Sequence, residues 1–271
     1  MGSKTITFTK MEGLGNDYIY IDVSRFPIEN PAELSRRLSD RHFGIGGDGI
    51  ILIGPSDRAD FSMRIFNADG SEGLMCGNGA RCVGKYVYDK GLTDKTTVKL
   101  ETLSGIKTLV LNVGEDSLVE SVSVEMGSYS FTGAPAEMTS HGRAFRGTGV
   151  DVGNPHYVIF TDDADTLDPA LYGPEIECDE AFPDRTNVEF AKVLSPGVIR
   201  MRVWERGSGI TMACGTGACA TAAAALKLGL SGDCSKVIMD GGSLTIGCSA
   251  ADRSIVMTGP AVTVFEGSVD I

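Results

Sequence analysis

Several features that would set a chain apart from ordinary globular proteins are missing from these 271 residues. No run of about 18 apolar residues is present, which argues against a membrane span. The start, Met1–Lys4, lacks the apolar core of a signal peptide, and Ile6 stands where a myristoylation signal needs serine or threonine. Basic residues are outnumbered 24 to 36 by acidic ones, which disfavours nucleic acids and anionic membranes as partners. We therefore expect a cytoplasmic protein with neither nucleic-acid nor membrane partners.

Histidine is scarce, and cysteine occurs in an odd number. The three histidines form no ligand pairs with the seven cysteines, and no Cys-x-x-Cys occurs, so we expect no metal site. An odd cysteine count in a chain without a secretion signal favours free thiols over a disulfide framework. Glycine, by contrast, is abundant at 35 residues, and several glycines form clusters typical of tight turns.

The chain also contains an internal repeat. Cys76–Ala80 (CGNGA) and Cys214–Ala218 (CGTGA) agree at four of five positions, and their offset is 214 − 76 = 138 residues. The same offset relates three further pairs of segments: Met63–Phe66 to Met201–Trp204, Gly91–Leu92 to Gly229–Leu230, and Gly15–Asn16 to Gly153–Asn154. Each half predicts a strand, a glycine turn and a helix. We infer two similar α/β lobes that face each other across a pseudo-two-fold axis.

The expected elements are short strands and a few helices. The strands fall at residues 6–9, 18–22, 50–53, 63–66, 97–101, 108–112, 236–239, 243–246 and 261–265, and the helices run from Asn30-Pro31 to about Arg41, over 80–89 and over 218–227. Short connections between strands predict antiparallel or mixed sheets. We expect an N-terminal lobe, residues 1–120, with Cys76, and a C-terminal lobe, 121–261, with Cys214. A last strand, 262–271, is expected to return to the first lobe.

One glycine cluster resembles a dinucleotide fingerprint but lacks its context. Gly44–Gly49 fits G-x-G-x-x-G, yet the strand-like Ile50–Ile53 follows it where the fingerprint opens a helix. We therefore do not assign nucleotide binding to this segment.

The two repeated cysteines suit the inversion of a carbon stereocentre. One group removes the proton on one face, and a second group returns a proton on the other. Each thiol is expected at a helix start, where the partial positive charge would lower its pKa from about 8.5 towards roughly 3.5–7.5. N–H groups of the glycine turns would bind a carboxylate and stabilise the charge that develops as the proton leaves. No cofactor is then required. The other five cysteines lack this setting and are expected to be ordinary: Cys82, Cys178, Cys219, Cys234 and Cys248.

The motifs of this chain resemble those of the diaminopimelate epimerase family over almost its whole length. They are Gly13–Asp17, Arg41–Gly46, Phe66–Ser71, Cys76–Arg81, Gly153–His156, Arg185–Glu189, Glu205–Gly207 and Ala213–Cys219. The resemblance implies an α/β (α+β) fold of two pseudo-symmetric lobes, each a mixed or antiparallel sheet around a central helix. It also implies a homodimeric isomerase of lysine biosynthesis that interconverts LL- and meso-diaminopimelate without metal or coenzyme.

The same resemblance implies roles for particular residues. Cys214 would remove the proton from the LL substrate, and Cys76 would donate one. The reacting carboxylate would be held by Gly77, Asn78, Gly215 and Thr216. The amino groups and the distal carboxylate would be bound by Asn16, Asn67, Asn154, Asn187, Glu205 and Arg206. His156 and Glu205 would tune the thiols.

Departures from the family pattern leave alternatives open. Gly49 stands where some members carry glutamine near the substrate, Ile210 where glutamate is frequent, and Phe265 where a tyrosine often supports the dimer. A racemase for histidine or hydroxyproline is the nearest alternative, although a short substrate gives Arg206 nothing to pair with. A thiol redox protein and a non-catalytic amino-acid-binding protein are alternatives of other classes. The asparagines could be turn formers, His156 structural, and Glu205 and Arg206 a surface ion pair.

Overall fold

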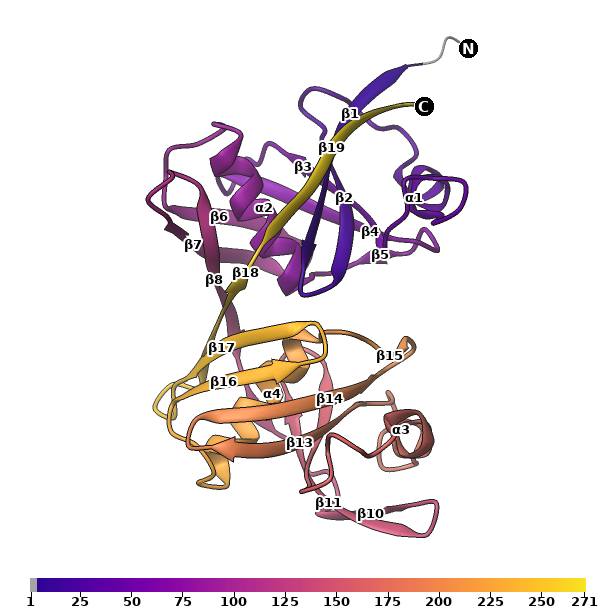
Figure 1. Ribbon diagram of the computed structural model, residues 1–271, viewed down its shortest axis with the longest axis vertical. Helices are drawn as coiled ribbons and strands as arrows, with labels where there is room; N and C mark the ends of the chain where they lie inside the picture. The colour runs from indigo at the N-terminus through magenta and orange to yellow at the C-terminus, as the bar shows by residue number, and fades with distance from the viewer. Residues whose placement is uncertain (1–3) are drawn as a thin grey trace. The chain divides into compact units, whose positions relative to one another are not determined.

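The computed structural model describes residues 4–271, which divide into two compact units (Figure 1). The first unit comprises the chain up to Val124 together with Gly259–Ile271, and the second comprises Glu125–Thr258. The chain thus passes twice from one unit to the other. None of the helices in the described part of the chain is long and apolar enough to cross a membrane.

The first unit is a mixed sheet around one helix. Its strands bond in the order β19 (Val262–Asp270), β1 (Thr5–Gly13), β2 (Asn16–Asp22), β3 (Gly49–Gly54), β4 (Phe61–Asn67), β6 (Thr97–Thr102), β7 (Gly105–Val113) and β8 (Val119–Ser128), with β5 (Glu72–Gly73) on β4. The pairs β2–β3 and β4–β6 are parallel, because α1 (Pro31–Ser39) and α2 (Gly77–Asp89) connect them. Helix α2 contacts β1, β2 and β7, so the sheet curves around it (Figure 1).

The second unit repeats this plan. Its strands bond in the order β9 (Ser130–Phe131), β11 (Arg143–Asp151), β12 (Pro155–Phe160), β13 (Asn187–Ser195), β14 (Val198–Glu205), β16 (Cys234–Met239), β17 (Gly242–Cys248) and β18 (Ser254–Pro260), with β10 (Glu137–Ser140) on β11 and β15 (Gly209–Ile210) on β14. Helices α3 (Pro169–Glu177) and α4 (Gly215–Lys227) connect the parallel pairs β12–β13 and β14–β16. Helix α4 contacts strands from β11 to β17 and fills the centre of this sheet.

The offset of 138 residues extends to whole elements. Added to the bounds of α1, α2 and β1, it gives the bounds of α3, α4 and β11. Helix α3 was not predicted from the sequence, although Asp168 caps it by accepting from the N–H of Ala170 and Pro169 opens it. The repeat would have located this helix if the offset had been applied to α1.

Local chemistry explains where the predicted helices begin and end. Asn30 caps α1 by accepting from the N–H of Glu33, as predicted. The helix ends at Ser39 and not near Arg41, because the Asp40 carboxylate takes the N–H groups of the next turn. The glycine cluster Gly44–Gly49 leads into strand β3, so it does not open a helix.

The two central helices are buried in different ways. The alanines at 222–225 of α4 are at most 2% exposed, so this helix packs closely against the surrounding sheet. In α2 the buried positions include Cys82, Val83 and Arg81. β19 returns along β1, so the yellow end of the chain lies beside the indigo start in Figure 1. The predicted sheet-rich α/β class, with mixed sheets and few helices, is confirmed.

Candidate active site

Cys76 is the N-cap of helix α2. Its backbone is extended, with φ −132° and ψ 117°, and its sulfur accepts a hydrogen bond from the N–H of Gly79 at 3.3 Å. The carbonyl of Cys76 accepts from the N–H of Ala80 at 2.8 Å. The side chain is partly exposed, and its Sγ also donates to Oδ1 of Asn16 at 3.3 Å. The thiol therefore stands at the helix start that the sequence predicts.

Cys214 occupies the same position at helix α4. Its φ and ψ are −119° and 107°, and its sulfur accepts from the N–H of Gly217 at 3.3 Å. Unlike Cys76 it is buried, with 4% of its surface exposed. The Thr216 hydroxyl lies 3.4 Å from the same sulfur. The two thiols share one backbone geometry but differ in their surroundings.

The helix starts also provide anion-binding groups. In each helix the third N–H is bonded to the cysteine sulfur and the fourth to the cysteine carbonyl. The first two N–H groups have no intrahelical acceptor. They belong to Gly77 and Asn78 in α2, and to Gly215 and Thr216 in α4. These are the four residues predicted to hold a carboxylate, and the helix dipole favours that charge.

Burial dominates the electrostatics of Cys214. Burial, and then the carboxylates of Glu205 and Glu189, raise the pKa of Cys214 well above its ordinary value, whereas bonds from Thr216 and Gly217 lower it. The prediction of a lowered pKa is therefore wrong for Cys214. The start of α4 stabilises the thiolate, but desolvation and two nearby negative charges destabilise it by more.

A buried pair, His156 and Glu189, lies close to Cys214. Nδ1 of His156 lies 2.7 Å from Oε1 of Glu189, and both side chains are fully buried. Nε2 of His156 lies 3.1 Å from Oδ1 of Asn154. A Cβ atom added at Gly217 would lie 2.8 Å from Oε1 of Glu189 and 3.3 Å from the Cys214 sulfur. The glycine thus keeps the space between carboxylate and thiol open. The two ring nitrogens of His156 thus face the carboxylate of Glu189 and the amide oxygen of Asn154.

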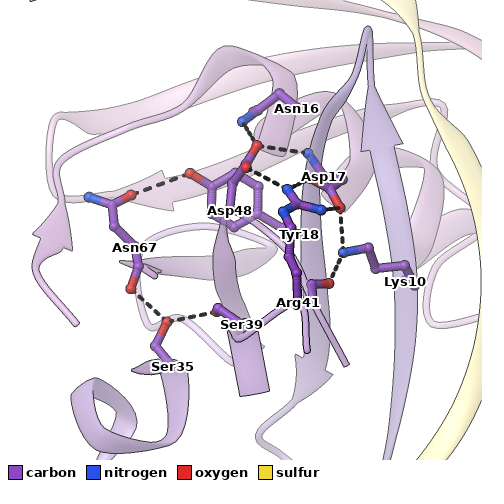
Figure 2. A network of polar contacts seen from close by, with 10 residues as sticks. Lys10, Asn16, Asp17, Tyr18, Ser35, Ser39, Arg41, Asp48 and Asn67 are labelled. Atoms are coloured by element: carbon purple, nitrogen blue, oxygen red, sulfur yellow. Dashed lines mark hydrogen bonds and ion pairs between the residues drawn. The ribbon is translucent and has the colours of Figure 1, made fainter. Parts of the chain in front are cut away.

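A network of polar groups lies beside Cys76 in the first unit (Figure 2). Nδ2 of Asn16 donates to Oδ2 of Asp48 at 2.8 Å, and the N–H of Asp17 donates to the same oxygen at 3.1 Å. Arg41 bridges the carboxylates of Asp17 and Asp48, and the buried Lys10 lies 2.6 Å from Asp17. Asn16 is placed by a two-residue turn of positive φ between β1 and β2.

The remaining asparagines have protein partners as well. Asn67, at the left of Figure 2, accepts from the Tyr18 hydroxyl. It also donates to the hydroxyl of Ser71. Asn78 is buried and accepts from the buried Arg81, so its backbone N–H is the group oriented for an anion. Asn187 donates to the carbonyl of Pro155 and accepts from a backbone N–H.

The last two predicted binding residues, Glu205 and Arg206, lie in the second unit, as Asn187 does. The N–H that it accepts belongs to Arg206, whose guanidinium donates to the carbonyl of Asp184 at 2.8 Å. Glu205 accepts from the Thr211 hydroxyl at 2.8 Å. Of the predicted binding side chains, that of Asn16 bonds the Cys76 sulfur, and that of Glu205 lies close enough to Cys214 to raise its pKa.

Two groups at the site were not singled out from the sequence. Glu189 lies in a buried strand, where an ionisable residue is a signal in itself. Asp48 lies inside the glycine cluster that was set aside. Next to it, a Cβ atom at Gly49 would lie 2.1 Å from the carbonyl oxygen of Phe66, so no side chain fits where some family members have glutamine.

Comparison with protein families gives one match. The model of the family described as diaminopimelate epimerase matches residues 8–132 and 148–264. Among similar proteins, the diaminopimelate epimerase of Parabacteroides distasonis is 55% identical over 269 residues, which cover 99% of this chain and all of that protein. That of Methanococcus maripaludis is 49% identical over 276 residues, covering 97% of this chain and 99% of that protein.

Solved structures share the fold at much lower identity. A PhzF-family phenazine biosynthesis protein from Bacillus anthracis superposes with a TM-score of 0.77 at 18% identity, covering 99% of this chain and 100% of that one. A hydroxyproline epimerase from Agrobacterium vitis, solved with bound trans-4-hydroxy-L-proline, gives 0.70 at 18% identity, covering 100% of this chain and 92% of that one. The fold is therefore shared with these proteins.

Proposed function

This chain belongs to the diaminopimelate epimerase family and is an isomerase, and we propose that it interconverts LL- and meso-diaminopimelate with two thiols, those of Cys76 and Cys214. The relatives named diaminopimelate epimerase, 47–55% identical over nearly the whole chain, support the substrate. Lysine biosynthesis is the pathway in which we place the reaction.

The identical setting of the two cysteines carries the proposal. Each is the N-cap of a 13-residue helix, and each sulfur accepts the third N–H at 3.3 Å. A repeat that places one thiol in each unit supplies two proton-transfer groups of the same geometry. Inversion at Cα needs such a pair, because the proton leaves one face and another arrives at the opposite face.

The helix starts support the hard part of the reaction. Removing the α-proton moves negative charge onto the adjacent carboxylate. The N–H groups of Gly77, Asn78, Gly215 and Thr216 are suited to stabilise that charge, because they are fixed donors at positive helix ends. We infer that the side chains of Asn16, Asn67, Asn154, Asn187, Glu205 and Arg206 bind the amino groups and the distal carboxylate.

The surroundings of the thiols favour a role for each. The Cys76 sulfur donates a hydrogen bond to Asn16, so Cys76 is in the protonated form, which is the form that returns a proton to Cα. Cys214 has a raised pKa, so its thiolate, once formed, is a strong base towards a carbon acid. We therefore assign proton removal from the LL isomer to Cys214 and proton donation to Cys76. The reverse reaction exchanges these roles.

The test is proton exchange at Cα. The purified chain is incubated in heavy water with LL-diaminopimelate, histidine or hydroxyproline, and deuterium uptake is followed by NMR. We expect uptake and epimerisation only with diaminopimelate. Exchange confined to histidine or hydroxyproline would refute the substrate.

Serine variants test the two thiols. Cys76→Ser and Cys214→Ser are each expected to lose about 10²–10⁴-fold in turnover, because a serine hydroxyl is a much weaker acid than a thiol and does not ionise to form the base. Cys234→Ser changes an exposed cysteine outside the site and serves as the matched control. Full turnover in either site variant would overturn the two-thiol mechanism.

We further infer a cytoplasmic homodimer. The exposed apolar side chains of β19 support an association surface: Val262 is 43% exposed, Val264 54% and Phe265 46%. The ring of Phe265 packs edge-on against Phe8 of the same chain, with 5.9 Å between centroids, which holds this face of the strand in place.

A further inference from the structure

We propose that Asp48 is a positioning residue for Cys76, because it fixes the side-chain amide of Asn16 so that the carbonyl oxygen, and not the NH2 group, faces the thiol. Nothing in the family resemblance or in the comparisons gives Asp48 a role. The inference deepens the proposed function, since it concerns the protonation state of one of the two thiols.

The first step is the orientation of the Asn16 amide. The two ends of an asparagine amide are similar in shape, so their assignment depends on the partners. Oδ2 of Asp48 lies 2.8 Å from one end of the amide, and the Arg41 guanidinium lies 3.0 Å from Oδ1 of the same carboxylate. A carboxylate beside arginine accepts at both oxygens. The end of the Asn16 amide that faces Asp48 is therefore the NH2 group.

The second step is the anchoring of Asp48 itself. Its Oδ2 also accepts the N–H of Asp17 at 3.1 Å, and its own N–H donates to the carbonyl of Asp17 at 2.7 Å. Its carbonyl accepts from the N–H of Ala68 at 2.9 Å. Figure 2 shows the carboxylate between Asn16, Asp17 and Arg41. These contacts hold the Asp48 carboxylate in place beside Asn16.

The third step is the effect on the thiol. With NH2 on Asp48, Oδ1 of Asn16 is the atom 3.3 Å from the Cys76 sulfur. A carbonyl oxygen accepts from S–H, but it repels a thiolate. The arrangement therefore favours the thiol, which is the proton-donating form. A reversed amide would donate N–H to the sulfur and favour the thiolate instead.

The repeat shows that this anchor belongs to one unit only. The position 138 residues after Asp48 is Thr186, and that after Asn16 is Asn154. Among residues 4–271, no carboxylate accepts from the amide of Asn154, and its Oδ1 faces His156 at 3.1 Å. Two helix starts of equal geometry thus receive different partners. Asp48 therefore acts on the protonation state of Cys76, whereas burial and carboxylates act on that of Cys214.

The test measures thiol reactivity and needs no substrate. The full chain is treated with iodoacetamide from about pH 5 to pH 10, and alkylation of each cysteine is followed by peptide mass spectrometry, since only the thiolate reacts. In Asp48→Ala the Asn16 amide is free to turn. We expect the alkylation midpoint of Cys76 to fall by about one pH unit, which is about tenfold faster alkylation at neutral pH. Cys214 in the same molecule is the internal control and should not change.

The matched variant is Asp48→Asn. Its side-chain oxygen can still accept from Asn16, so we expect a Cys76 profile close to that of the wild type. A shift as large as that of Asp48→Ala would contradict the positioning role. An unchanged Cys76 profile in folded Asp48→Ala would overturn it outright.

A second route covers the case in which Asp48→Ala does not fold. Asn16→Ala removes the acceptor of the S–H group, so the Cys76 midpoint should again fall, while Asp48→Asn should not move it. An unchanged profile in Asn16→Ala would overturn the proposal. The alkylation assay measures no turnover, so the two proposals fail independently. A chain that does not epimerise diaminopimelate refutes the proposed function, but the alkylation of Cys76 still tests the role of Asp48.

Discussion

At Gly217, the third residue of α4, a single added carbon atom should measurably lower the free energy of unfolding. Its Cβ would lie 2.8 Å from Oε1 of Glu189 and 3.3 Å from the sulfur of Cys214. That oxygen lies 2.7 Å from Nδ1 of His156 in a fully buried pair. The carboxylate cannot withdraw without lengthening this contact. We therefore predict that Gly217→Ala destabilises the second unit.

Three contributions set the size of the effect. Alanine is favoured over glycine within a helix by about 1 kcal/mol. Overpacking a filled interior costs about 1–3 kcal/mol. Weakening a buried hydrogen bond to a carboxylate costs about 1.5–3 kcal/mol. The free energy of unfolding of Gly217→Ala should therefore fall by about 1.5–5 kcal/mol.

The repeat provides a matched control at Gly79, the same position in α2. Its Cβ would lie 2.6 Å from Cδ1 of Ile51, the end of a side chain that can change rotamer, and 3.7 Å from the Cys76 sulfur. A rotamer strain of about 1 kcal/mol offsets a similar gain in helix propensity. We therefore expect Gly79→Ala to stay within about 1 kcal/mol of the wild type.

Urea unfolding measures both variants. Circular dichroism reports on the whole chain, and fluorescence of the single tryptophan, Trp204 in β14, reports on the second unit. We expect a lower urea midpoint in the Trp204 signal of Gly217→Ala. The urea midpoints of Gly79→Ala should hardly change. A Gly217→Ala protein as stable as the wild type, or an equal loss in Gly79→Ala, would refute the argument.

Three further predictions concern charge and association. Burial is the main cause of the raised pKa of Cys214, and the carboxylates of Glu205 and Glu189 raise it further. Glu189→Gln removes one of these carboxylates, so the Cys214 alkylation profile should move to lower pH; an unmoved profile contradicts this. Burial alone would raise the pKa of Asp17, but hydrogen bonds from basic side chains, that of Arg41 foremost, lower it. Its stabilisation is then present above the unfolded-state pKa of about 3.9 and is lost as the pH falls through the folded value. Asp17→Asn, which also leaves a buried lysine without its carboxylate, should therefore lower the urea midpoint at neutral pH, and the gap to the wild type should close in acid. Val264→Glu places a charge on the exposed face of β19 and should convert the proposed dimer to monomer in sedimentation; an unchanged mass would place the interface elsewhere.

The sequence alone determined the repeat, the fold class and the positions of the two thiols. These features depend on local chemistry. A cysteine followed by glycines at a helix start becomes an N-cap because its sulfur can accept the third N–H, and this holds in both α2 and α4. The same repeat contained the bounds of α3, since α1 shifted by 138 residues gives them. Features that depend on residues close in sequence, such as the helix caps and helix bounds, could therefore be predicted.

Only the tertiary structure decided how the two thiols differ. The local sequence predicts a lowered pKa at each helix start, yet Cys214 is buried near Glu189 and Glu205, which come from β13 and β14. Cys76 receives Asn16, whose amide is fixed by Asp48 from another segment. Desolvation and charge depend on which distant strands pack around an atom. A repeated motif therefore fixes equal backbone geometry, while the packing around each copy sets its chemistry.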